Sequence, residues 1–215
     1  MTEFPMGEVN FYLPGPAGKL EVLTSTPSVM LNKPLIGVIC HPHSLFGGTM
    51  HNKVVYTIAR AFKELGMPTV RFNFRGVGAS EGHYDEGKGE TDDLLAVLQW
   101  LKQIKPEALF WLAGFSFGSY VAARAATQWP IEQLVSVAPP VVNFNFAELS
   151  DIPCPWLIVQ GDADEIVDPN AVFSWINSLA VPAQLIRMPG ASHFFHGQLI
   201  ELRQALITNL LPNIN

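Results

Sequence analysis

The sequence predicts an α/β domain in which a mostly parallel sheet of about eight strands is flanked by helices and carries no large lid. From residue 35 onward, short apolar runs alternate with longer segments of helical period, the pattern of parallel strands joined by helical crossovers. The runs are almost continuously apolar, as expected for strands that helices cover on both faces. The chain has 215 residues, of which 48% are hydrophobic. That is enough for one core, so residues 1–215 are predicted to form a single domain.

The predicted strands follow the apolar runs. Two of them, residues 7–13 and 19–24, flank a turn rich in proline and glycine and are expected to pair as an antiparallel hairpin at the sheet edge. The other six are residues 35–40, 69–73, 108–113, 133–138, 156–160 and 183–188.

Helices are predicted where apolar residues recur at helical spacing between these strands. The first ends at Gly66, with Pro68 preventing its continuation. A later helix begins at Asp168, whose side chain is a suitable N-cap, with Pro169 in the first turn. Further helices are expected around residues 94–101, after residue 119, and over about 196–210.

Composition excludes several classes of function. The formal net charge is −6 and no run of lysine or arginine is present, so nucleic acid is not an expected partner. The N-terminus does not resemble a signal peptide and no apolar run is long enough to span a bilayer, so we expect a soluble, cytoplasmic protein. Only 15% of residues are charged, which indicates apolar surface and is compatible with a homodimer. Cys40 and Cys154 lie in or beside apolar runs, where reduced thiols are expected.

A candidate nucleophile lies directly after the strand at 108–113. Gly114, Ser116 and Gly118 form a Gly-x-Ser-x-Gly motif between this strand and an alanine-rich helical segment. The motif suits a serine on a sharp strand-to-helix turn, because side chains larger than glycine at the flanking positions would collide there. The backbone N–H of Phe117, at the start of the helix, is predicted to donate to an oxyanion.

A candidate acid and base follow in the order that such a serine requires. The strand at 156–160 leads into a loop with three aspartates. We favour Asp164 over Asp162 and Asp168, since Asp168 is explained as a helix cap and Asp162 as a residue bonded within its turn. The strand at 183–188 leads into a glycine-containing loop with His193, which we favour over His196 as the base. Ser116, Asp164 and His193 are therefore the predicted catalytic triad.

The loop after the first parallel strand, residues 41–48, reads His-Pro-His-Ser-Leu-Phe-Gly-Gly. His41 and His43 could bind a metal, but two histidines one residue apart, without other clustered ligands, are a weak zinc signal, so no metal is predicted. Nothing in the sequence requires a cofactor.

This loop, together with residues 72–82, resembles the α/β-hydrolase superfamily, specifically its small lidless members with a His-Pro-His-Pro-like loop followed by Gly-Gly. Residues 74–82 are similar to the family segment Phe-Arg-Gly-x-Gly-x-Ser-x-Gly. The plan is similar to that of dienelactone hydrolases, which carry cysteine as nucleophile, and of prolyl-oligopeptidase catalytic domains, which normally come with a propeller. The resemblance covers most of the chain.

The resemblance carries implications for individual residues. The family's acid usually lies three residues after the strand-end glycine, which implies Asp164. It also implies that the N–H of His43 completes the oxyanion hole. Ser44 is the alternative, and it stands where such loops often have proline. Ser44, Leu45 and Phe46 are assigned as candidate substrate-binding residues.

These features predict a serine hydrolase that cleaves a small-molecule carboxylic ester, thioester or related acyl bond through an acyl-enzyme. A peptidase or acyltransferase with the same triad, and a binding protein on a hydrolase scaffold, are the alternatives. Phe144 and Phe146 are predicted to form an apolar wall of the site. Arg71 and Arg75 are interpreted as charge partners of the acidic stretch at 81–93, with anion binding by Arg75 as the alternative.

Overall fold

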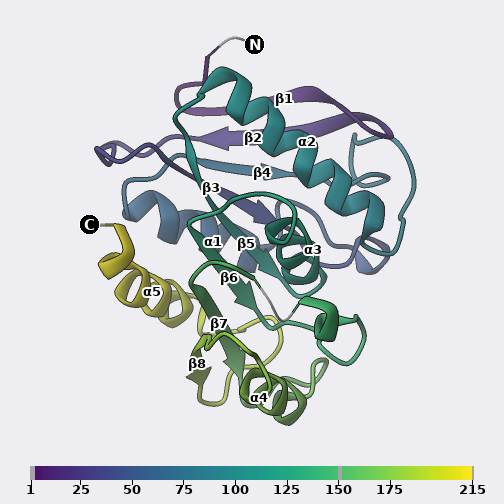
Figure 1. The fold of residues 1–215 in the computed structure, drawn as a ribbon, viewed down its shortest axis with the longest axis vertical. Coiled ribbons are helices and arrows are strands. Elements are labelled where there is room, and N and C mark those ends of the chain that lie inside the picture. The colour runs from purple at the N-terminus through teal and green to yellow at the C-terminus, as the bar shows by residue number, and fades with distance from the viewer. Residues whose placement is uncertain (1–2, 150–151, 215) are drawn as a thin grey trace.

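The computed structural model describes residues 3–149 and 152–214. Its strands form one eight-stranded sheet in the order β1-β2-β4-β3-β5-β6-β7-β8 (Figure 1). β1 pairs with β2 and β2 with β4 in antiparallel fashion, while the remaining neighbours are parallel. The strands are β1 Glu8–Gly15, β2 Gly18–Ser25, β3 Leu35–Cys40, β4 Thr69–Phe72, β5 Leu109–Phe115, β6 Gln133–Val137, β7 Trp156–Gly161 and β8 Gln184–Met188. The predicted sheet and its edge hairpin are therefore confirmed.

Helices cover both faces of this sheet. The helices are α1 Lys53–Glu64, α2 Lys88–Ile104, α3 Phe117–Ala126, α4 Pro169–Asn177 and α5 Leu199–Leu210. Buried residues of α2, α3 and α4 belong to one apolar cluster, and those of α1 and α5 belong to a second. The strands contribute to both clusters, which explains why they are apolar on both faces.

The parallel pairing places several loops at one edge of the sheet. The carboxyl ends of β3, β5, β7 and β8 all point the same way. The loops that follow them carry His43, Ser116, Asp164 and His193, respectively. Ligands of open α/β sheets bind at this edge, so the topology brings together residues that lie up to about 150 positions apart.

The last helix begins later than predicted. α5 starts at Leu199, whereas the sequence indicated a start near residue 196. The reason is a tight loop in which Phe195 has φ 53° and Gly197 φ 75°, both in the left-handed region that an α-helix excludes. His196 therefore lies in the loop.

The segment between β6 and β7 differs from its predicted role as an apolar wall. It contains a short 3-10 helix, Phe146–Leu149, and residues 150 and 151 lie outside the described residues. Phe146 is fully buried and packs edge-on against Trp175 of α4, so it belongs to the core. Phe144 is the aromatic residue of this segment that reaches the surface cleft described below.

The two cysteines are free thiols, as expected. Burial raises the pKa of Cys154 to about 11, so that thiol stays protonated at neutral pH. In the part of the chain that the structure describes, no helix combines the length and the apolar character needed to cross a membrane.

Candidate active site

Ser116 occupies the turn between β5 and α3. Its backbone angles, φ 52° and ψ −123°, are strained for a residue other than glycine. A Cβ added at Gly118 would lie 2.5 Å from the carbonyl oxygens of Cys40 and His41, and one at Gly114 would collide with the backbone of Gly118. The two motif glycines are therefore required by close backbone contacts, as the sequence predicted.

The structure brings the three predicted triad side chains together. Nε2 of His193 lies 3.2 Å from Oγ of Ser116. On the other side of the ring, Nδ1 lies 2.9 Å from Oδ2 and 3.2 Å from Oδ1 of Asp164. His193 is 3% exposed and packs against Phe115 and Phe194, which keep its ring in place. This arrangement can move a proton from a serine hydroxyl to an imidazole and stabilise the resulting positive charge.

The carboxylate of Asp164 is buried and accepts several hydrogen bonds. Its oxygens accept hydrogen bonds from the backbone N–H groups of Ile166 and Val167 and from the amide of Gln160. Burial by itself would raise the pKa of Asp164, but the bonds from His193, Val167 and Ile166 outweigh burial and hold this pKa below its ordinary value. The carboxylate is thus ionised at neutral pH.

The competing candidates have other partners. Asp168 caps α4 by accepting from the N–H of Asn170, as predicted. Asp162 accepts from the N–H of Gly190 in the loop after β8, rather than within its own turn. His196 is exposed, and its N–H donates to Ser192.

Two backbone N–H groups near Ser116 have no acceptor. Among the described residues, neither the N–H of Phe117 nor that of His43 donates a hydrogen bond. The loop that holds His43 is closed by bonds from the N–H groups of Phe46 and Gly48 to the His43 carbonyl oxygen. Unpartnered donors at a helix start and in a fixed loop are suited to an anionic oxygen.

The two loop histidines use their ring nitrogens in hydrogen bonds within the protein. His41 is fully buried, with Nε2 accepting from the N–H of Phe74 and Nδ1 donating to the Pro42 carbonyl. Burial lowers the pKa of His41 to about 4. His43 accepts from the N–H of Leu45 and bonds to the hydroxyl of Tyr84. Both rings therefore stabilise the loop and its neighbours.

Ser116 opens into a surface cleft of about 600 Å³. Of the candidate substrate-binding residues, Phe46 lines this cleft, with 85% of its surface exposed. Ser44 and Leu45 lie along a neighbouring hollow instead. The lining residues are His43, Phe46, Tyr84, Glu86, Ser116, Phe117, Pro140, Asn143, Phe144, Asn145, Ile166 and Val167. Nothing in the local sequence pattern marks Tyr84, Glu86 or the two asparagines as cleft residues.

Known proteins resemble this chain in sequence and in fold. The family model described as alpha/beta hydrolase fold matches residues 37–152. The chain belongs to the α/β-hydrolase family. It is also 36% identical over 208 residues to an uncharacterized protein of Rickettsia prowazekii, covering 91% of this chain and 85% of that one.

Two solved structures are similar to this hydrolase over nearly its whole length. One is an alpha-beta serine hydrolase homologue from Coxiella burnetii, with 51% identity, a TM-score of 0.94, and coverage of 97% of this chain and 100% of that one. The other, from Xanthomonas campestris, is a serine hydrolase without a lid, with 48% identity, a TM-score of 0.92, and coverage of 97% and 95%. The predicted α/β-hydrolase fold without a large lid is confirmed.

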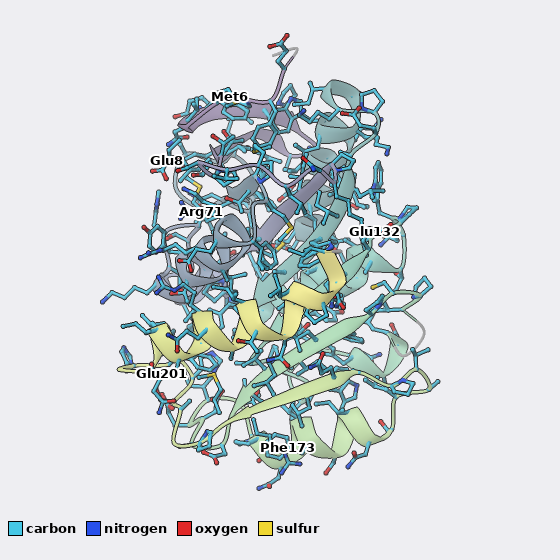
Figure 2. All side chains as sticks on the ribbon, turned by 90° about the vertical axis from the view of Figure 1, so that its left-hand side faces the viewer. Met6, Glu8, Arg71, Glu132, Phe173 and Glu201 are labelled. Carbon is cyan, nitrogen blue, oxygen red and sulfur yellow. The ribbon has the colours of Figure 1, made fainter. Side chains whose placement is uncertain are left out.

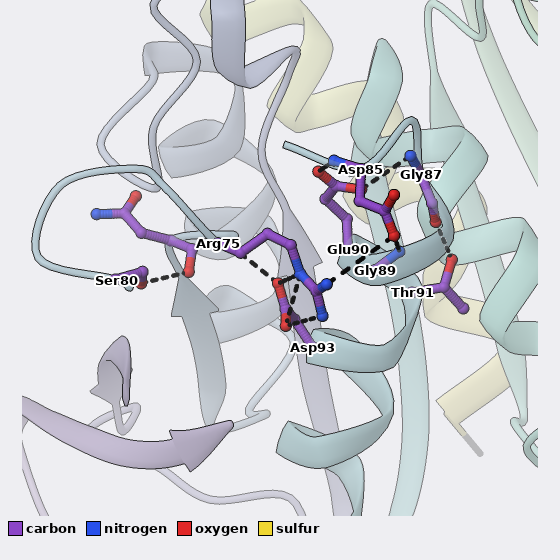
Figure 3. Close-up of polar contacts among 9 residues, drawn as sticks. Arg75, Ser80, Asp85, Gly87, Gly89, Glu90, Thr91 and Asp93 are labelled. Carbon is purple, nitrogen blue, oxygen red and sulfur yellow. Dashed lines mark hydrogen bonds and ion pairs between the residues drawn. The ribbon is translucent and has the colours of Figure 1, made fainter. Parts of the chain in front are cut away.

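Arg75 of the hydrolase pairs with the acidic stretch, as predicted. Its guanidinium forms a bidentate contact with Asp93, at 2.8 Å from Nη2 to Oδ1, and lies 4.0 Å from Asp85 (Figure 3). The Asp93 side chain is fully buried, and the hydrogen bond between the two side chains holds the pKa of Arg75 above its ordinary value. Arg75 therefore anchors the loop that precedes α2.

The same interpretation was wrong for Arg71. Its side chain, 4% exposed, donates to the carbonyl of Met50 and lies over the ring of Tyr56, away from residues 81–93. In Figure 2 it lies on the same side of the molecule as Glu8 of the edge strand. Arg71 lies in β4, so its side chain is confined to one face of the sheet and cannot reach the acidic stretch. The closeness of Arg71 to that stretch in the sequence does not reveal on which face of the sheet the side chain lies.

Arg75→Met is expected to lower the free energy of unfolding by about 3 to 5 kcal/mol, because it leaves the Asp93 carboxylate buried without its partner. Arg60→Met is the matched control. Arg60 pairs with Glu64 at 3.8 Å on the exposed side of α1, and its loss should cost less than about 1 kcal/mol. Urea unfolding followed by circular dichroism measures both. Equal losses in the two variants would contradict the anchoring role of Arg75.

Proposed function

We propose that this hydrolase cleaves carboxylic esters, thioesters or related acyl bonds of small molecules through an acyl-enzyme formed on Ser116. The observation that carries the proposal is the continuous hydrogen-bonded chain from Asp164 through His193 to Ser116, ending in a cleft. A buried ionised carboxylate, an imidazole and an elbow serine together form the arrangement that activates a hydroxyl for attack on a carbonyl.

The distances support each proton movement. As the Oγ–carbon bond forms, Nε2 of His193, 3.2 Å away, accepts the Ser116 proton. Asp164, 2.9 Å from Nδ1, holds the ring in the tautomer that leaves Nε2 free to accept, and stabilises the imidazolium. The bond from the carbonyl carbon to the alcohol or thiol then breaks, and His193 returns the proton to that leaving group. Water then attacks the acyl carbon while His193 accepts its proton. The bond from this carbon to Oγ of Ser116 breaks, His193 returns the proton to Ser116, and the carboxylic acid is released.

Attack also places negative charge on the carbonyl oxygen. We assign its stabilisation to the N–H groups of Phe117 and His43, neither of which donates a hydrogen bond among the described residues, although the same is true of the Ser44 N–H. Each such donor contributes about 2.7 to 4 kcal/mol to transition-state stabilisation in a known serine hydrolase. The Ser44 N–H is the alternative second donor.

An ester panel tests the proposal against its alternatives. Aryl esters and thioesters with two to eight acyl carbons should be hydrolysed, and the matched anilides should be turned over at least about 100-fold more slowly. Turnover of anilides at comparable rates would favour a peptidase. No turnover by folded protein would favour a binding protein, and the proposed function would then fail.

A further inference from the structure

One carboxylate lines the cleft next to Ser116. Among the lining residues, Glu86 is the only one with a formal charge at neutral pH. Burial lowers the pKa of His43, which keeps its imidazole neutral. Burial, followed by the nearby charges of Glu90 and Glu86, raises the pKa of Tyr84, so its hydroxyl stays protonated. The electrostatic character of the cleft therefore depends on Glu86.

The backbone of Glu86 is held in an unfavourable conformation. Its φ is 52°, in the left-handed region that residues other than glycine seldom adopt. The buried carboxylate of Glu90 fixes the peptides on either side, accepting from the N–H of Asp85 at 2.9 Å and of Gly87 at 2.8 Å (Figure 3). Thr91 adds a bond from its hydroxyl to the Gly87 carbonyl. Strain that surrounding contacts maintain is most common at functional sites.

The side chain of Glu86, by contrast, has no protein partner. Among the described residues, no hydrogen bond or ion pair involves its carboxylate, although Lys88 lies two positions away in the sequence and Arg75 contacts the neighbouring Asp85. The Arg75 guanidinium is already engaged by Asp93 and Asp85. Glu86 is thus an exposed acidic residue in the cleft lining, and no described residue pairs with its carboxylate.

Aromatic residues line the same cleft as Glu86. The ring of His43 lies 4.8 Å from Tyr84, 4.8 Å from Phe46 and 5.0 Å from Phe117, centroid to centroid. Phe117 in turn lies 5.2 Å from Phe144. The Glu86 loop packs on the neighbouring aromatic side chains, because a Cβ added at Gly87 would lie 2.8 Å from the Tyr120 ring and 3.6 Å from the Phe117 ring. Aromatic faces attract cations, and a carboxylate beside them adds to that attraction.

We propose that Glu86 and the solvent-accessible aromatic rings of His43, Phe46, Tyr84 and Phe144 form a subsite for a cationic group. The enzyme accordingly prefers acyl substrates that carry an ammonium group over neutral substrates of the same shape. This inference rests on the proposed function, since it concerns the substrate that Ser116 attacks.

Two pairs of substrates isolate the charge. In the first pair, acetylthiocholine carries the ammonium in the leaving group, and S-3,3-dimethylbutyl thioacetate replaces its nitrogen with carbon. In the second, p-nitrophenyl 4-(trimethylammonio)butanoate carries it in the acyl group, and p-nitrophenyl 5,5-dimethylhexanoate is its carbon counterpart. The readout is the ratio of kcat/KM for the cationic to the neutral member. Comparing this ratio between variants cancels any difference in intrinsic reactivity.

Wild-type enzyme should favour the cationic member of at least one pair by about five- to twentyfold at low ionic strength. The preference should shrink in 0.5 M NaCl, because salt screens an exposed carboxylate. Glu86→Gln should bring the ratio down to about twofold, the part that the rings contribute. Glu86→Gly should do the same, and it accepts a positive φ without strain, which separates the loss of charge from a folding defect.

Glu132→Gln is the control. It removes the same charge directly before β6, at the amino-terminal ends of the parallel strands, whereas Ser116 follows the carboxyl end of β5, so the ratio should stay unchanged. Equal kcat/KM within both pairs in an active wild-type enzyme would overturn the cation subsite but not the proposed function. An unchanged ratio in the two Glu86 variants would do the same. Absence of turnover on all four substrates, together with failure on the ester panel, would overturn both.

Discussion

Replacement of Ser116 by alanine is expected to lower kcat on an aryl ester by at least about 10⁴-fold, because Ser116 is the only serine, threonine or cysteine among the described residues that line the cleft. The remaining activity would come from the unpartnered N–H groups and from binding alone. Initial rates on the best ester of the panel measure the effect. The loss should appear in kcat, with KM changed little, since the hydroxyl acts in the transition state.

Ser178→Ala is the matched control for this variant. It makes the same chemical change at the end of α4, where the hydroxyl's one hydrogen bond among the described residues goes to the Trp175 carbonyl. Its kcat should equal that of the wild type. If Ser116→Ala retained more than about a tenth of the wild-type rate while remaining folded, Ser116 would not be the nucleophile.

Asp164→Asn is expected to lower kcat by about 10⁴-fold. An asparagine amide can donate to Nδ1 of His193, which would favour the tautomer that carries its proton on Nε2. That ring could not accept the proton of Ser116 at a distance of 3.2 Å. The circular dichroism spectrum should stay unchanged, since the new carbonyl oxygen can still accept from the N–H groups of Ile166 and Val167.

The same substitution at the two other aspartates of this loop tests whether Asp164, rather than Asp162 or Asp168, is the acid of the triad. Asp162→Asn keeps an acceptor for the Gly190 N–H, and Asp168→Asn keeps a good helix cap. Each should reduce kcat by less than about tenfold. A larger loss in either of them than in Asp164→Asn would reassign the acid.

The sequence predicted features that depend on local pattern. Continuous apolar runs indicated the strands, and the glycines around Ser116 indicated the turn, because each reflects contacts close in sequence or a backbone shape that only glycine permits. Chain order then indicated His193, which lies beside Ser116 because loops at the carboxyl ends of parallel strands converge on one edge. Family resemblance contributed to the preference for Asp164.

Features that depend on long-range packing were not predictable in this way. Glu86 and Tyr84 lie in an acidic stretch without helical or strand period, and only the folded loop places them in the cleft with Phe117 and Phe144. Phe146 is two residues from Phe144, yet it turns into the core. The left-handed conformation of Phe195 makes α5 begin at a later residue than predicted, and phenylalanine is not a residue type that indicates this conformation.

The central claim is that Ser116 is an activated nucleophile. Its most direct test is to treat folded protein with a fluorophosphonate, which phosphonylates activated serines, and to locate the adduct by mass spectrometry of peptides. We predict a single adduct on Ser116, with labelling lost in Ser116→Ala and strongly slowed in His193→Ala. An unlabelled wild-type protein, or an adduct on another residue, would contradict the account.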